Sequence, residues 1–410
     1  HSQTPLSYLD YGETASVSLT SLTAELWLSG AFWKERLLQG IASNDDMARR
    51  VLPPTVNLQA KRDIYFGSKR GGDFLLAPSA VGNLHLEAGG IISGLYNDML
   101  GTPRRATLRL SDLDPKGVYG MRMISWDVLG DLRADETREV SHAATPIHDK
   151  DPVPSLVKAG GDIRELRLVT PEMTKLDAGG DITGLYFFGQ NLKPTDVSTI
   201  RAEENIALSS ITNPSIEDTG FIMSGPGQFL VQAGDSIDLG STQGVQAVGN
   251  AFYSALSEEA GVMAVMAGIT KEMSGDELSV FFEELREYGE EFSELLAGPS
   301  EAASVEEIVE EARTVLINPL LDDSTGLGGN IDMTSSNVSS SSKAGDIFVM
   351  ATGDVNVGLT RLVDPSEAQS ESNQAQRQET GIFTAKGGAI NIFSVRSEEH
   401  TSELQSLLII

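Results

Sequence analysis

The sequence predicts a mainly β protein, a parallel β-helix (solenoid) into which an α-helical hairpin is inserted. Three observations support this fold: a glycine-rich corner motif that recurs, short alternating strands that follow it, and one acidic segment with helical periodicity. The 410-residue chain is rich in turn-forming glycine, with 41 of them, and is 40% hydrophobic, as expected of a folded protein.

The corner motif reads AGGDI at residues 159–163 and again at 178–182, with echoes at 202–206 (AEENI) and 233–237 (AGDSI). Asp162 and Asp181 are 19 residues apart, which suits one winding of a three-sided solenoid. We expect the glycines to supply the positive φ of a sharp turn, a region that Asp and Asn also tolerate. The predicted structural turn residues are Gly160, Gly161, Asp162, Gly179, Gly180, Asp181, Gly225, Pro226, Gly227, Gly234, Asp235, Gly345, Asp346, Gly387 and Gly388.

A short strand pattern with alternating apolar residues follows many of these corners. It occurs at residues 63–66, 205–208, 236–239, 330–333, 346–349, 354–357 and 389–392. Strands this short cannot form a core alone, so each is expected to pair with its copy in the coils above and below. A β-sandwich of many short strands is the alternative fold.

We divide the chain into five segments. Residues 1–51 form a β-rich lead-in with a short helix near residues 31–50, 52–250 the β-helix coils, and 251–318 an acidic α-helical insertion. Residues 319–395 resume the β-helix, and 396–410 resemble the translation of a sequencing adapter. We therefore expect the sequence to be a fragment of a longer protein.

The insertion carries most of the helical signal. Apolar residues between Leu278 and Leu296 fall on one helical face, and a second helix is expected to start at Ser304. Residues 251–313 contain sixteen acids and three bases, so this segment holds −13 of the net charge of −29. The pattern predicts a helical hairpin packed on the side of the solenoid, with a solvated acidic outer face.

The net charge and composition of the chain limit the kinds of partner and site that it can have. A net charge of −29 disfavours nucleic acid and anionic membranes. No apolar run is long enough for a transmembrane helix. The absence of cysteine excludes disulfides and thiolate metal sites.

No catalytic residue, cofactor site or metal site is expected. Calcium ligation by the turn aspartates would need tandem nonapeptides, so we favour turn residues that bond their own backbone. His85 is expected to face solvent, while His142 and His148 lie in a polar loop, as a metal pair or, more commonly, as surface histidines. No carboxylate pair stands out and neither GxSxG nor HExxH occurs, so the chain is not expected to be an enzyme.

The landmark stretches resemble the filamentous haemagglutinin family of large secreted adhesins, in the region downstream of the secretion domain. They are LLAPSAVGNLHLEAGG, HDKDPVPSLVKAGGDI, SGPGQFLVQAGDSIDLGSTQGVQAVGN and GIFTAKGGAINIFS, between residues 75 and 394. The resemblance implies a right-handed β-helix, export through an outer-membrane transporter of a two-partner secretion system, and a place outside the cell or on its surface. It also implies binding to a receptor on a host cell, matrix or other bacterium. The alternatives are a surface polysaccharide lyase or hydrolase, and the stalk of a contact-dependent toxin.

Overall fold

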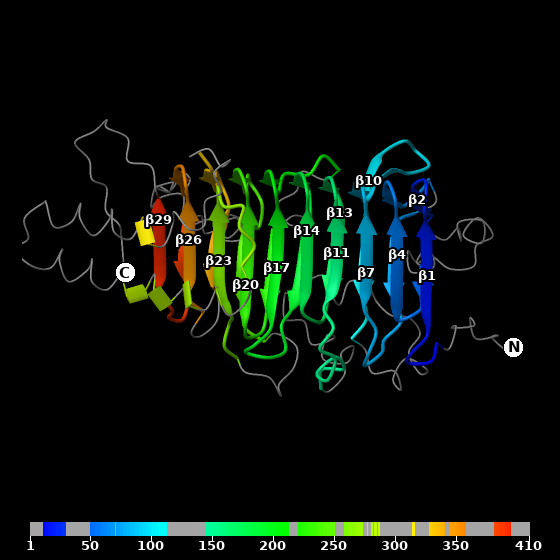
Figure 1. Cartoon of the computed structure of the whole chain (residues 1–410), viewed down its shortest axis with the longest axis horizontal. Coiled ribbons are helices and arrows are strands. Elements are labelled where there is room, and N and C mark those ends of the chain that lie inside the picture. Colours follow the sequence, from blue (N-terminus) through cyan, green and yellow to red (C-terminus); the bar gives the residue numbers. More distant parts are fainter. Residues whose placement is uncertain are drawn as a thin grey trace, which may run out of the picture.

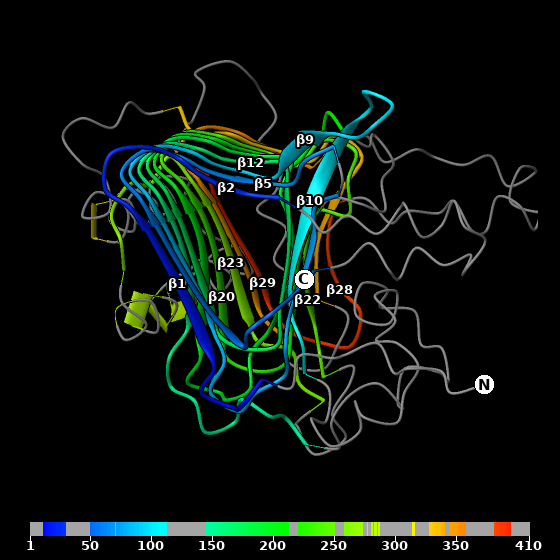
Figure 2. The same cartoon turned by 90° about the vertical axis from the view of Figure 1, so that its right-hand side faces the viewer.

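A computed structural model shows the predicted solenoid. Three sheets form its sides, and the chain visits them in the same order in each coil (Figures 1 and 2). All neighbouring strands within the three stacks pair in parallel, which confirms the parallel β-helix and excludes the β-sandwich. The residues that the structure describes are 11–29, 50–69, 71–112, 145–212, 220–250, 258–273, 277, 280–281, 283–284, 286–287, 314–315, 328–340, 345–357 and 381–394.

The strands divide among the three sheets as follows. Sheet A contains β1 (Ser16–Ser21), β4 (Thr55–Ala60), β7 (Leu84–Ala88), β11 (Ser155–Ala159), β14 (Thr174–Ala178), β17 (Val197–Ala202), β20 (Gln228–Ala233), β23 (Val262–Ala267), β26 (Ile347–Ala351) and β29 (Ile390–Ser394). Sheet B contains β2 (Leu26–Leu28), β5 (Ile64–Phe66), β8 (Ile92–Ser93), β12 (Ile163–Arg164), β15 (Ile182–Thr183), β18 (Ile206–Ala207), β21 (Ile237–Asp238), β24 (Ile331–Asp332) and β27 (Val355–Asn356). Sheet C contains β3 (Arg50–Leu52), β6 (Asp73–Leu76), β10 (Pro103–Leu110), β13 (Leu166–Thr170), β16 (Tyr186–Gln190), β19 (Gly220–Ser224), β22 (Val245–Val248), β25 (Asn337–Ser340) and β28 (Gly381–Thr384), with β9 (Leu95–Asn97) antiparallel to β10.

The core is a set of columns, because parallel strands in register place like residues above one another. In sheet B, the isoleucine that follows each corner stacks on the isoleucine of the next coil and is fully buried. This column contains Ile64, Ile92, Ile163, Ile182, Ile206, Ile237 and Ile331. The last interior residue of most sheet A strands is alanine, which forms a second column: Ala60, Ala88, Ala159, Ala178, Ala202, Ala233, Ala267 and Ala351.

The prediction of positive φ holds for four of the predicted corner glycines and is wrong for the other six. Positive φ occurs at Gly225, Gly227, Gly387 and Gly388, but not at Gly160, Gly161, Gly179, Gly180, Gly234 or Gly345. A Cβ on Gly179 would lie 2.5 Å from the carbonyl oxygen of Gly160 in the preceding coil. Glycine is therefore needed because neighbouring coils approach closely at this corner.

The corner aspartates also differ from the prediction, because they bond the next coil and not their own backbone. The amide of Asp181 donates to Asp162 Oδ1 at 3.0 Å, and the amide of Asn205 donates to Asp181 Oδ1 at 2.9 Å. Asn205 Oδ1 in turn accepts from the amide of Ser236 at 3.1 Å. The repeated motif therefore forms a hydrogen-bonded ladder that runs along the edge between sheets A and B.

The strand units found in the sequence belong to two corners, not one. Units such as 63–66 and 205–208 contain sheet B strands, whereas 346–349 and 389–392 contain β26 and β29 of sheet A. The first coil begins at Ser16, so it includes strands of the predicted lead-in, 1–51. The expected helix near residues 31–50, the helix from Ser304 and the tail at 396–410 lie outside the described residues, apart from Arg50 and residues 314–315.

Part of the first inserted helix is described, at residues 277, 280, 281, 283, 284, 286 and 287. Its Phe281 is 6% exposed and packs against outward side chains of sheet A, as expected for an insertion on the side of the solenoid. Within the described residues, no helix has the length and apolarity needed to span a membrane.

Candidate functional site

The outer face of sheet A extends over ten parallel strands, and its character changes along the stack. In β4, β7, β11, β14 and β17, outward residues form two columns that we call the polar face. They are Asn57, Gln59, His85, Glu87, Leu156, Lys158, Lys175, Asp177, Thr199 and Arg201. Nine of the ten are polar, and all are exposed or half-buried. His85 lies on this outward face, as predicted, with its side chain 37% exposed.

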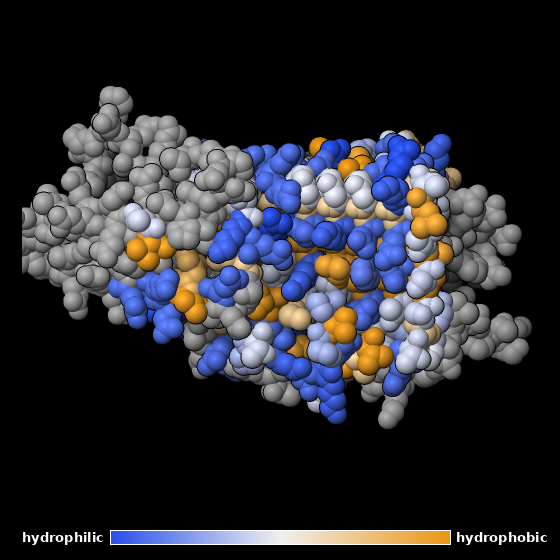
Figure 3. Space-filling model, viewed as in Figure 1, coloured by the Kyte–Doolittle hydropathy of each residue, from blue (hydrophilic) through white to orange (hydrophobic). Residues whose placement is uncertain are grey.

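Charges on the polar face are interleaved and partly paired. Asp177 lies 3.9 Å from Lys158 Nζ and accepts a 2.9 Å hydrogen bond from Arg201 Nη1. Arg201 Nη2 also donates to the carbonyl of Thr270 at 2.8 Å, which ties the end of the face to the segment after β23. Figure 3 shows many hydrophilic side chains over this part of the solenoid, mixed with neutral and some hydrophobic ones.

The same face becomes apolar in β20, β23, β26 and β29. Outward residues here form a cluster with the inserted helix: Leu230, Ala264, Met266, Ile269, Met273, Phe281, Phe348 and Met350, with Phe393 packed against them. We call this the covered face. Arg286 of the inserted helix donates to Asp346 Oδ2 at 2.9 Å, beside the apolar contact. This half of sheet A is therefore used for internal packing.

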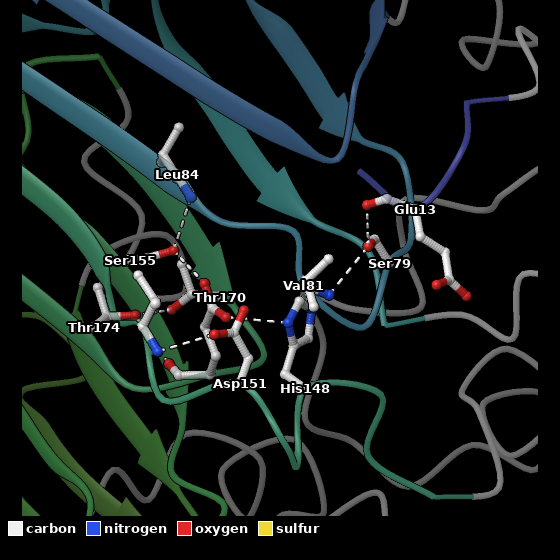
Figure 4. A network of polar contacts seen from close by, with 11 residues as sticks. Glu13, Ser79, Val81, Leu84, His148, Asp151, Ser155, Thr170 and Thr174 are labelled. Carbon is white, nitrogen blue, oxygen red and sulfur yellow. Dashed lines mark hydrogen bonds and ion pairs between the residues drawn. The ribbon is translucent and has the colours of Figure 1, made fainter. Parts of the chain in front are cut away.

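A second group of polar side chains lies at the corner between sheets C and A (Figure 4). His148 and Asp151 precede β11, and Glu172 occupies the turn between β13 and β14. His148 Nδ1 lies 3.1 Å from Glu172 Oε2, yet neither atom makes a well-aligned hydrogen bond. His148 is 3% exposed, so the sequence-based expectation of a surface histidine was wrong for this residue. His142 lies outside the described residues.

Glu172 is held by its neighbours. Ser155 Oγ donates to Glu172 Oε1 at 2.5 Å and accepts from the amide of Leu84 at 3.1 Å. Burial raises the pKa of Glu172 above its ordinary value, and the neighbouring His148 imidazole and the hydrogen bond from Ser155 oppose that rise. The buried carboxyl is thus fixed in place while one of its oxygens faces His148.

The predicted turn residues are dispersed along the solenoid and do not converge on one site. Asp162 and Asp181 belong to the ladder between sheets A and B, whereas Gly225–Pro226–Gly227 and Gly345–Asp346 lie between sheets C and A. Asp346 Oδ1 accepts from the amide of Ala389 at 2.8 Å in the next coil. In the AGDSI corner, Ser236 takes the ladder position, and Asp235 is an exposed neighbour.

Glu172 was missed because nothing in its local sequence, TPEMT, separates it from other acids in turns. The polar face could have been recognised from the outward residues of alternating strands once their register was known. Comparison with protein-family models, curated proteins and solved structures finds no match to this chain.

Proposed function

We propose that this chain is a segment of an extracellular adhesin of filamentous haemagglutinin type, which binds a cell-surface receptor through its polar face. The observation that carries this proposal is the contrast on sheet A: one half of the outer face is covered by the insertion, and the other is accessible. An accessible flat array of polar side chains on a rigid support suits binding without a large loss of conformational entropy.

The ladders explain how the face is held rigid. Each coil pairs with the next through all three sheets, and corner side chains add further bonds between coils. Because each coil is held by its two neighbours, a large rearrangement of a single coil is disfavoured. The solenoid would present the lysines, carboxylates and amides of the polar face in fixed positions away from the cell.

Export through a two-partner transporter, as the sequence resemblance implies, belongs to the same proposal. A chain without cysteine needs no oxidative step outside the cell, and parallel coils can form one after another as the chain emerges. Secretion from a strain with and without the transporter gene beside the source locus would test this part.

Binding is tested with the purified chain on bacterial and epithelial cells. The double variant Lys158→Ala/Lys175→Ala removes two charges from the polar face, and we expect at least a tenfold loss of cell binding. Lys61→Ala/Lys69→Ala removes the same charge from exposed positions off this face and should bind as the parent does. Equal binding by both variants would refute the role of the polar face. Degradation of neutral or acidic polysaccharides would instead favour the enzymatic alternative.

A further inference from the structure

The corner cluster of His148, Asp151 and Glu172 has the composition of a metal site. One ligand atom from each residue, an imidazole nitrogen and two carboxylate oxygens, lies within 4.8 Å of the other two. Imidazole and carboxylate are common ligands of Zn²⁺, with bonds of about 2.0–2.2 Å. The 3.1 Å between His148 Nδ1 and Glu172 Oε2 is close to the roughly 3.4 Å that tetrahedral ligands show at such bond lengths.

The cluster contains buried polar atoms that the protein leaves without hydrogen bonds. They are His148 Nδ1 and Nε2, Asp151 Oδ2 and Glu172 Oε2. An unsatisfied buried polar group destabilises the folded state. His148 Nδ1 and Glu172 Oε2 make only a 3.1 Å contact with each other, whereas a bound cation would be a partner for all three residues at once.

In each of the two carboxylates, the other oxygen already accepts a hydrogen bond from the protein. Asp151 Oδ1 accepts from the amide of Val153 at 3.0 Å, and Glu172 Oε1 accepts from Ser155 Oγ. Each carboxylate thus has one oxygen anchored by a protein donor and one left for a ligand. Anchoring of this kind orients the ligands of known metal sites.

Charge also favours a dication. Metal ligation requires deprotonated carboxylates and a neutral imidazole, so the ligand set would carry −2, which Zn²⁺ would neutralise inside a buried corner. An imidazole ligand selects zinc over calcium, which prefers oxygen ligands alone.

We propose that His148, Asp151 and Glu172 bind one Zn²⁺ ion that fastens the segment before β11 to the turn between β13 and β14. The ion would join two successive coils at the corner between sheets C and A. Zinc has a structural role here, and Ser155 is a positioning residue that orients Glu172. The sequence-based expectation of no metal site treated His148 as a surface histidine, which the structure corrects.

The test is calorimetric titration of the metal-stripped full chain with Zn²⁺, combined with thermal unfolding. We expect one zinc per chain and a higher melting temperature with zinc. His148→Ala and Glu172→Gln should each abolish this binding. Ser155→Ala should weaken it by about 10–100-fold, the usual effect of losing an anchoring partner.

His85→Ala serves as the matched control, since it removes an imidazole that lies on the outer face of sheet A and outside the proposed ligand set. It should retain the stoichiometry and affinity of the parent. Circular dichroism identifies variants that fail to fold, and X-ray absorption at the zinc edge of the parent provides a check that needs no variant. It should show nitrogen and oxygen ligands near 2.0–2.2 Å. Failure of the folded parent to bind zinc would overturn the proposal, as would unchanged binding by folded His148→Ala and Glu172→Gln.

Discussion

The two halves of sheet A share the same interior and differ in their outer faces. In β11, β14 and β17 the outward columns contain Lys158, Lys175 and Arg201, whereas in β23 and β26 the matching columns contain Met266 and Met350. The alanine column runs through both halves from β4 to β26, and in β29 Ser394 takes this position. Interior residues thus specify the coil, and outward residues specify what the coil contacts.

The difference also explains the position of the insertion. The chain leaves the solenoid after β23 and returns at β24, so the inserted helix can pack on the strands it has just left. Its Phe281 meets an apolar surface there, while its exposed Glu283, Glu284 and Glu287 point to solvent. An identical helix placed on the polar face would bury lysine and arginine at a high cost in desolvation.

The largest effect is expected from Phe281→Ala, which removes the anchor of the helix on the covered face. Loss of a buried phenylalanine costs about 3–5 kcal/mol, although detachment of the helix alone would leave the coils folded. Limited proteolysis should therefore cut the insertion much faster in the variant, while the strands remain protected. Unchanged proteolysis would show that Phe281 does not hold the helix in place.

Corner glycines should be equally intolerant of a side chain in both halves. Added Cβ atoms at Gly179 and Gly234 would lie 2.5 Å and 2.0 Å from carbonyl oxygens of the preceding coils. We expect Gly179→Ala and Gly234→Ala each to lower the free energy of unfolding by about 1–3 kcal/mol, measured with denaturant. Gly328→Ala is the control, because its added Cβ meets nothing within 4 Å. If only one of the two variants lost stability, the coils of the two halves would differ in how closely they approach at this corner.

Arg286→Ala should have a smaller effect. The Arg286–Asp346 ion pair is partly exposed, at 43% and 21% of the two side chains, so its contribution is about 0–1 kcal/mol. Hydrogen exchange should quicken modestly in the inserted helix and stay constant in β26. An effect as large as that of Phe281→Ala would contradict the apolar basis of the docking.

The smallest effect on stability is expected from Lys158→Ala on the polar face. Lys158 is 54% exposed and lies 3.9 Å from Asp177, so denaturant unfolding should change by no more than about 0.5 kcal/mol. A large loss of stability would show that this face contributes to folding. Weaker cell binding by the lysine variant could then result from unfolding and not from a lost contact.

Periodicity in the sequence was enough to predict the coils but not their contacts. Repeated motifs place Ile163, Ile182 and Ile206 in equivalent positions, and alternation gives each a buried strand. The reason for Gly179 and the partner of Asp162 could not be predicted, because both depend on the spacing between coils. The contact between His148 and Glu172 could not be predicted either, because Glu172 lies one coil further along the same corner and three strands separate the two residues in the sequence.

Oxidative footprinting with peroxide, followed by mass spectrometry, tests the contrast between the two halves most directly. Met266 and Met350 lie on the outer side of sheet A but are only 1% exposed, whereas Met99 is 56% exposed. We predict that Met99 oxidises rapidly, that Met266 and Met350 are protected, and that Phe281→Ala makes both reactive. Amine labelling of the same sample should modify Lys158 and Lys175. Rapid oxidation of Met266 and Met350 in the unmodified chain would contradict the covered face and, with it, the division on which the proposed binding surface depends.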